Sequence, residues 1–302
     1  MWTRIGQITS PDSSDSRLHS HMAVPIVEPY RGSIKRLYFS ARDAQNRSRT
    51  FRSLFDLSRL QDGLISEPEL VLDLGELGTF DDSGAMASWL CIEGEARYLY
   101  YIGWNLGQTV PFRNAIGLAI SLRDGPFERI GLGPIMDRTI AEPHFVASSC
   151  VLKTDVCWTM WYVSCVEWTE TLDGPRHRYH IKHASSRDGV VWAREGVVAI
   201  DFEDQSEFAI SRPSVLRLGG KWWMWFSCRG KHYRIRSATS LDGVSWRREA
   251  VSFGLDANGF GLEQEVVEYP YMFVEEGVLY AAYNGDGYGR DGVLFARWDG
   301  HF

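Results

Sequence analysis

A short apolar segment with a small residue or a proline near its start recurs five times along this chain of 302 residues. The copies read VPIV, ASWL, SSCVL, RPSVL and YPYMF, and they begin at Val24, Ala87, Ser148, Arg212 and Tyr269. Their second residues are separated by 63, 61, 64 and 57 positions. A fixed period of this length is typical of repeat architectures in which each unit is one small sheet.

Two further strand-like segments follow each copy at similar offsets. The second segments are RLYFSARD, YLYYIGWN, WTMWYVSC, WWMWFSCR and LYAAYNGD, and aromatic or aliphatic residues alternate in them with small or polar ones. We expect an all-β protein, a five-bladed β-propeller of about 60 residues per blade that forms a single domain over residues 1–302. The spare segment WTRIGQI at 2–8 is expected to complete the last blade, which leaves no exposed sheet edge.

A turn motif, Ser-x-Asp-Gly-x-x-Trp, occurs at 186–192 and again at 240–246. Asp and Gly are the residues that tight turns between strands require, and the tryptophan is suited to packing between neighbouring sheets. We therefore interpret the repeated motif as structural, and its aspartates are not candidates for catalysis.

Composition narrows the classes of function. The formal net charge is −7, which argues against a nucleic-acid groove or an anionic membrane surface, and no apolar run is long enough for a membrane helix. The five cysteines form no CxxC pair and are expected to be reduced, mostly buried thiols. The first residues do not resemble a signal peptide, so we expect a cytoplasmic protein. The 12 tryptophans and 13 tyrosines suit stacking against a sugar.

Two zones of each repeat are expected to face one mouth of a propeller: the residues that lead into the first strand and those that end the second. The lead-in residues with candidate chemistry are His21, Asp82, Glu142, Arg212 and Glu268. The second-strand ends and adjoining loops supply Arg42, Asp43, Trp104, Asn105, Arg113, Glu167, Trp168, Arg229, Asn284, Asp286 and Tyr288. Carboxylates, arginines and aromatic rings around one axis would make a carbohydrate pocket. Two carboxyl groups about 5–5.5 Å apart suit retention at a glycosidic bond, and about 6.5–9.5 Å suits inversion.

Structural roles compete with each of these assignments. A carboxylate at a strand start is often a turn cap, and FDDSG at 80–84 is also an ordinary turn signal. His21 fits a hydrogen-bonded inner residue better than a metal ligand, and we expect neither a metal nor a cofactor. The glycines of YNGDGYGRDG at 283–292 fit a hairpin better than a phosphate-binding loop, because no helix is expected to follow them.

The stretches RPSVLRLGGKWWMWFSCRG and SATSLDGVSW resemble the blade unit of five-bladed glycosidases of the arabinanase and β-xylosidase type, glycoside hydrolase family 43. Fructosidases of family 32 and mannoside-phosphorylase propellers are also similar. More narrowly, HMAVPIV, LYFSARDAQNRSR, LGTFDDSGAMASW, YYIGWN and YNGDGYGR resemble a group of bacterial propeller proteins that accompany sugar and surface-polysaccharide biosynthesis.

The resemblance implies an acid Glu and a supporting Asp in inner lead-ins, for which Glu142 and Asp82 are the nearest matches. It also implies an Asp base beside the proline of the first inner strand. This chain has Val24 there, with His21 three residues earlier. Either another carboxylate, such as Asp43 or Glu268, replaces that base, or the protein does not hydrolyse by this route.

Three hypotheses follow. In the first, the protein is an enzyme acting on a glycosidic bond, with Glu142 as general acid and Asp82 as orienting carboxylate or base. Trp104, Trp168 and Tyr288 would then stack on the sugar. In the second, it binds or rearranges a sugar, a nucleotide-sugar or a natural-product intermediate without hydrolysis, and its arginines hold an anionic group of that ligand. In the third, it is a protein-interaction scaffold.

Overall fold

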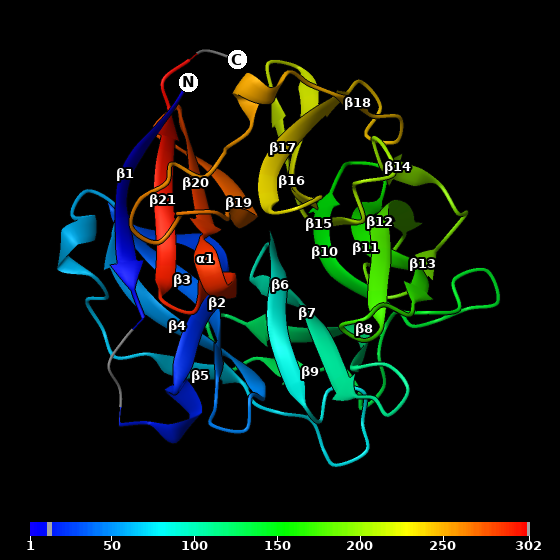
Figure 1. Cartoon of the computed structure of the whole chain (residues 1–302). Helices are drawn as coiled ribbons and strands as arrows, with labels where there is room; N and C mark the ends of the chain where they lie inside the picture. The colour runs from blue at the N-terminus through cyan, green and yellow to red at the C-terminus, as the bar shows by residue number, and fades with distance from the viewer. Residues whose placement is uncertain (11–13, 301–302) are drawn as a thin grey trace. The chain divides into compact units, whose positions relative to one another are not determined.

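The computed structural model describes residues 1–10 and 14–300 (Figure 1). Its regular structure is almost entirely β-strand, so the all-β prediction is confirmed. The helical segments are single turns: η1 (Ser16–Leu18), η2 (Leu60–Asp62), η3 (Val251–Phe253) and α1 (Asp286–Gly289). None of the helices in this part of the chain has the length and apolar character needed to cross a bilayer. The residues form two compact units, unit 1 (Met1–Val71 and Ser214–Phe302) and unit 2 (Leu72–Pro213).

Unit 1 contains up-and-down groups of strands that follow the sequence repeat. The first group pairs in the order β2 (Ser20–Arg31), β3 (Ile34–Arg42), β4 (Ser48–Asp56) and β5 (Glu69–Leu72). The next runs from the end of β15 (Ala209–Leu218) through β16 (Lys221–Arg229) and β17 (Tyr233–Ser240) to β18 (Arg247–Arg248). Apolar side chains at alternate strand positions, among them Trp225, Met272 and Tyr283, pack into one shared hydrophobic core.

The last group of unit 1 contains the N-terminal strand. It pairs in the order β19 (Glu268–Glu275), β20 (Val278–Asn284), β21 (Gly292–Trp298) and β1 (Trp2–Thr9), and β1 lies antiparallel beside β21 in Figure 1. Trp2 is buried, with its ring 6.4 Å from that of Trp225 and 5.4 Å from that of Trp298. The predicted completion of the last sheet by the N-terminal strand is confirmed.

Unit 2 repeats the same pattern. One group pairs in the order β6 (Gly84–Glu93), β7 (Ala96–Leu106), β8 (Phe112–Leu122) and β9 (Glu128–Arg129). The other comprises β10 (Val146–Lys153), β11 (Trp158–Thr169) and β12 (Arg176–Ser186), with β13 (Trp192–Ala193) and β14 (Val198–Ile200) on β12. Four of the five cysteines are buried, as expected.

A β-bulge interrupts the first strand of most groups at the repeated small or proline position. The pairing register shifts between Ala87 and Trp89 in β6, between Ala147 and Ser149 in β10, and between Glu268 and Tyr271 in β19. A bulge places two residues opposite one and bends the strand. The first residues of these strands, Glu268 among them, therefore lie out of register with the rest of the ladder.

Both copies of the Ser-x-Asp-Gly-x-x-Trp motif form the same turn, which confirms the structural interpretation. Asp242 accepts hydrogen bonds at 2.8 Å from the backbone N–H groups of Val244 and Ser245, and Asp188 does the same in the other copy. The donation from Ser245 and Val244 lowers the pKa of Asp242 to about 2. Gly243 has φ +77°, which favours glycine.

Candidate functional site

A carboxylate, a tyrosine and a cation form the same cluster three times. In each copy the tyrosine lies 20 residues after the carboxylate, in the second strand of its group, and its hydroxyl donates to the carboxylate. A cation from later in the group, or from β1 in the last group, lies within 3.1 Å of the same carboxylate. The three sets are Asp81–Tyr101–Arg129, Glu142–Tyr162–Arg194 and Glu263–Tyr283–Arg4. Because the cluster recurs, we infer that its carboxylate anchors the loop before each first strand to the sheet that follows.

Glu142, the predicted general acid, belongs to this structural set. Its carboxylate is 5% exposed and accepts hydrogen bonds from Tyr162 at 3.1 Å and Ser164 at 2.7 Å. The amino group of Lys182 lies 3.2 Å away and Arg194 lies 3.1 Å away. Burial favours the protonated form, but the Ser164 hydrogen bond and the Lys182 and Arg194 charges together lower the pKa of Glu142. A carboxylate kept ionised by two cations is a poor proton donor, so these surroundings favour an anchor.

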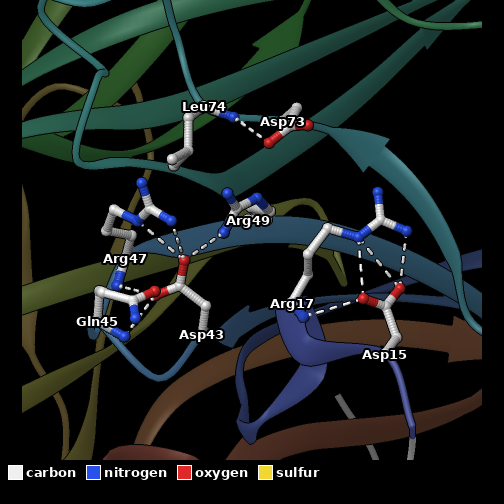
Figure 2. Close-up of polar contacts among 8 residues, drawn as sticks. All are labelled: Asp15, Arg17, Asp43, Gln45, Arg47, Arg49, Asp73 and Leu74. Atoms are coloured by element: carbon white, nitrogen blue, oxygen red, sulfur yellow. Dashed lines mark hydrogen bonds and ion pairs between the residues drawn. The ribbon is translucent and has the colours of Figure 1, made fainter.

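Asp43, a predicted alternative base, organises the turn after β3 (Figure 2). It accepts hydrogen bonds from the backbone of Gln45 at 3.0 Å and of Arg47 at 2.9 Å, and from the guanidinium of Arg49 at 2.8 Å. Burial opposes ionisation, but the hydrogen bonds from Arg49 and Arg47 lower the pKa of Asp43. With its oxygens occupied in this way, Asp43 is not favoured as a base.

Asp82 has a different environment: it is half-buried and forms no ion pair within residues 1–10 and 14–300. Asn105 donates to it at 2.7 Å, the backbone of Gly78 at 3.0 Å and Ser83 at 2.9 Å. Burial raises the pKa of Asp82, but these hydrogen bonds, led by that of Asn105, lower it overall. An ionised, partly accessible carboxylate is compatible with the predicted orienting or base role. The side chain of Trp104, the residue before Asn105, packs directly on Gly84. A Cβ added to Gly84 would lie 1.8 Å from the indole nitrogen of Trp104.

The remaining candidates of unit 2 differ in exposure. Arg212 is fully buried and donates to the backbone carbonyl of Ser88, so it holds β15 to β6. Arg113 and Glu167 are exposed, and Glu167 forms an ion pair with Arg178 at 3.4 Å. Trp168 is half-buried, with ring centroids 5.5 Å from Phe112, 5.8 Å from Phe145 and 5.1 Å from His177.

Unit 1 brings together six of the chemically active side chains, which we call the basic cluster: His21, Arg42, Arg229, Glu268, Tyr288 and Arg290. They come from β2, β3, β16, β19 and the segment that contains α1. All six come from the lead-ins and second-strand ends that the sequence predicted to face the mouth. Tyr233 and Tyr269, whose rings border the cluster, were not predicted as site residues.

Glu268 is the most unusual residue of the basic cluster. It is fully buried as the first residue of β19, opposite Asn284, and neither carboxylate oxygen has a hydrogen-bonding partner among the described residues. Burial raises its pKa well above the ordinary value; the charge of Arg229 and the neighbouring Tyr269 oppose the shift without cancelling it. Glu268 therefore keeps its proton under conditions in which most glutamates have lost theirs.

Arg229 and His21 have different neighbours within the basic cluster. Arg229 donates to the hydroxyl of Tyr288 at 3.2 Å, and its guanidinium lies 5.2 Å from the centre of the Tyr233 ring. His21 Nδ1 lies 2.8 Å from Ser20 Oγ. Burial, and then the positive charges of Arg42 and Arg290, lower the pKa of His21 to about 4. His21 is therefore neutral at physiological pH.

Asn284 and Asp286, predicted to bind substrate, make backbone contacts instead. Asn284 is fully buried, accepts from the N–H of Val24 at 2.9 Å and donates to the carbonyls of Met22 and Gly292, both at 2.9 Å. Asp286 accepts hydrogen bonds from three successive backbone N–H groups at 264–266, at 2.8, 3.1 and 2.8 Å. These two residues support the segments that carry the basic cluster.

Two proteins of Mycobacterium tuberculosis resemble this chain over nearly their whole length. They are the uncharacterized proteins MT1551 of strain CDC 1551 and Rv1502 of strain H37Rv, each 38% identical over 295 residues, 98% of this chain and 98% of theirs. The chain belongs to their family. No protein-family model matches the sequence.

Solved structures of similar fold are mostly glycoside hydrolases. A structure of BT0996 in an RGII complex has a TM-score of 0.73 at 15% identity, covering 98% of this chain and 92% of that one. An α-L-arabinofuranosidase from Lactobacillus brevis has a TM-score of 0.68 at 13% identity, covering 93% and 91%. A thermostable family-43 glycoside hydrolase has a TM-score of 0.64 at 16% identity, covering 96% and 92%. At such identities the likeness establishes the fold alone, which is that of β-propeller glycoside hydrolases.

Proposed function

We propose that the protein binds a sugar or sugar conjugate at the basic cluster and acts on a glycosidic bond, with Glu268 as the group that protonates the leaving oxygen. The observation that carries this proposal is a fully buried carboxyl group with no ion pair among the described residues, whose pKa burial raises well above its ordinary value. The fold of glycoside hydrolases makes a sugar the expected substrate class.

The opposite pKa shifts of Glu268 and Glu142 favour Glu268 as the general acid. A general acid must hold its proton in the resting enzyme and release it as negative charge develops on the leaving oxygen. Burial supplies the first property to Glu268. As the proton leaves, Arg229 stabilises the carboxylate that forms, because its charge already favours the ionised form. Glu142 lacks the proton to give, since Lys182 and Arg194 stabilise its ionised form.

A substrate reaches Glu268 only after the side chains around it move, because none of its surface is exposed. Tyr288 is suited to move, since it is 42% exposed and lies between Gly287 (φ +70°) and Gly289 (φ +79°). Tyr288 itself has φ +61°, a conformation that is costly for a residue with a bulky side chain. The prediction for this residue was stacking on the sugar, and we propose that a sugar ring stacks on Tyr288 once it has moved.

The test is the hydrolysis of a panel of aryl glycosides by the wild type and by Glu268→Gln. We expect turnover of at least one glycoside by the wild type and a loss of about 100-fold to 10,000-fold in the variant, because one positioned proton donor contributes about that much. The variant should stay folded, since glutamine has the shape of a protonated glutamate. Wild-type activity in Glu268→Gln would exclude Glu268 as the acid.

One observation favours the alternative of binding or rearrangement without hydrolysis. Hydrolysis by two carboxyl groups needs an ionised base, and the other candidate carboxylates of unit 1 are already engaged. Asp43 is bound by Arg47 and Arg49, and Asp286 by backbone N–H groups. Tight sugar binding by the wild type, with no turnover of any glycoside, would support this alternative.

A further inference from the structure

The arginines of the basic cluster meet around shared neighbours. Arg229 donates to the Tyr288 hydroxyl, and Arg42 lies within electrostatic reach of the same hydroxyl and of Tyr269. Arg42 and Arg290 both act on His21. The three guanidinium groups, which come from β3, β16 and the residue after α1, therefore lie near the same side chains in unit 1.

The positive charge of these arginines is incompletely balanced by nearby carboxylates. Arg42 is half-buried, hydrogen-bonds the side-chain oxygen of Asn46 at 3.0 Å and has no ion pair among the residues that the structure describes. Among the residues that the structure places, the one ion-pair partner of Arg290 is Asp291, at 3.4 Å between exposed groups. Burial shifts the pKa values of His21 and Glu268 toward their neutral forms. Asp286 contributes one negative charge, with its oxygens directed to backbone N–H groups.

Burying a guanidinium without a counter-ion is unfavourable, and burial lowers the pKa of Arg42 accordingly. A site that keeps such a group gains affinity for a ligand that supplies the missing negative charge. Guanidinium groups bind carboxylates and phosphates through paired hydrogen bonds, which neutral hydroxyls cannot match. The protonated carboxyl of Glu268 adds a donor without adding a repelling charge.

We infer that the basic cluster selects a sugar that carries a carboxylate or phosphate group, and that Arg42 and Arg229 bind this anion. The inference rests on the proposed sugar site and names its substrate class. The Tyr288 hydroxyl, which now accepts from Arg229, would be released toward the ligand when the anion takes its place. Uronic acids and sugar phosphates share the required chemistry.

The test is isothermal titration calorimetry with a panel of uronic acids, a panel of sugar phosphates, the matching neutral sugars and inorganic phosphate. We expect at least one acidic sugar to bind at least 10-fold more tightly than its neutral counterpart. Arg42→Gln should remove that preference, so that the acidic sugar binds no more tightly than its neutral counterpart. The control is Arg59→Gln, which alters an exposed arginine of unit 1 that pairs with Asp62.

The outcomes separate the two proposals. If neutral and acidic sugars bind equally, or if no acidic sugar binds, the inference is overturned, whereas glycoside turnover that depends on Glu268 would still support the proposed function. If inorganic phosphate binds as tightly as every sugar phosphate and no uronic acid binds, the cluster holds an anion only and the inference is overturned. An Arg42-dependent preference for acidic sugars without turnover supports the inference and removes the hydrolytic function. The two acidic panels show which anion the cluster prefers.

Discussion

Replacing Glu142 by glutamine should destabilise the protein strongly and leave its chemistry intact. The carboxylate balances Lys182 at 3.2 Å and Arg194 at 3.1 Å, and the two cations are only 13% and 14% exposed. Glutamine keeps the shape and continues to accept from Ser164 and Tyr162, but it leaves both cations without a counter-charge. Breaking a buried ion pair in this way costs about 3–5 kcal/mol. We expect the lower end, about 3 kcal/mol, because both cations retain some contact with water.

Urea unfolding followed by circular dichroism measures this loss, and a fall of roughly 6–12 °C in Tm should accompany it. The loss should also depend on pH. The pKa of Glu142 is lowered in the folded state, so its contribution is complete above the unfolded pKa of about 4.3. The contribution disappears as pH falls through the folded pKa. The wild type and Glu142→Gln should therefore differ most near neutral pH and least in acid.

The result that would refute this reasoning is a Glu142→Gln protein as stable as the wild type but without activity. That combination would make Glu142 the proton donor and return the site to the assignment that the sequence alone suggested. A destabilised variant that retains turnover below its melting temperature would support the structural role.

Two further predictions concern unit 1. Arg4→Met should lower the free energy of unfolding by about 2 kcal/mol and accelerate amide exchange in β1, because Arg4 alone among the described residues forms an ion pair with the buried Glu263. Arg297→Met, which breaks an exposed pair with Asp299, should cost less than about 0.5 kcal/mol, and equal losses would contradict the argument. Burial raises the pKa of Glu268 in the folded wild type, so folding takes up a proton above about pH 4.3. The free energy of unfolding of the wild type should therefore fall by about 1.4 kcal/mol per pH unit between the unfolded and folded pKa values, a dependence that Glu268→Gln removes. The variant should lose none of this, and parallel pH profiles of unfolding would count against a raised pKa.

The strand pattern was predictable because it depends on local chemistry. The period of about 60 residues set the positions of the first strands, and alternation of side chains set the second ones. The Asp-Gly turns followed from the conformational freedom of glycine, and the pairing of β1 with β21 followed from the missing fourth strand of the last repeat. Whether the repeats close into one five-bladed ring stays a prediction.

The roles of individual carboxylates were not predictable in the same way. A glutamate before a first strand has the same local sequence signal whether its partner is a cation, as for Glu142, or none, as for Glu268. The cations that pair with Glu142 lie 40 or more residues away in the sequence, and their approach depends on strand register. One signal was present in the sequence and was missed: a tyrosine 20 residues after Asp81, Glu142 and Glu263 marks the structural set. Tyr288 also lies 20 residues after Glu268, but it lies in α1 instead of a second strand, so the spacing has to be read together with the strand pattern.

Infrared difference spectroscopy between the wild type and Glu268→Gln at neutral pH tests the central claim most directly, because the carbonyl band of a protonated carboxyl is separate from that of a carboxylate. We expect the wild type to show a protonated carboxyl band that the variant lacks, and we expect this band to shift when an acidic sugar binds. A carboxylate band in its place would mean that Glu268 is ionised at rest, which would contradict its assignment as the proton donor.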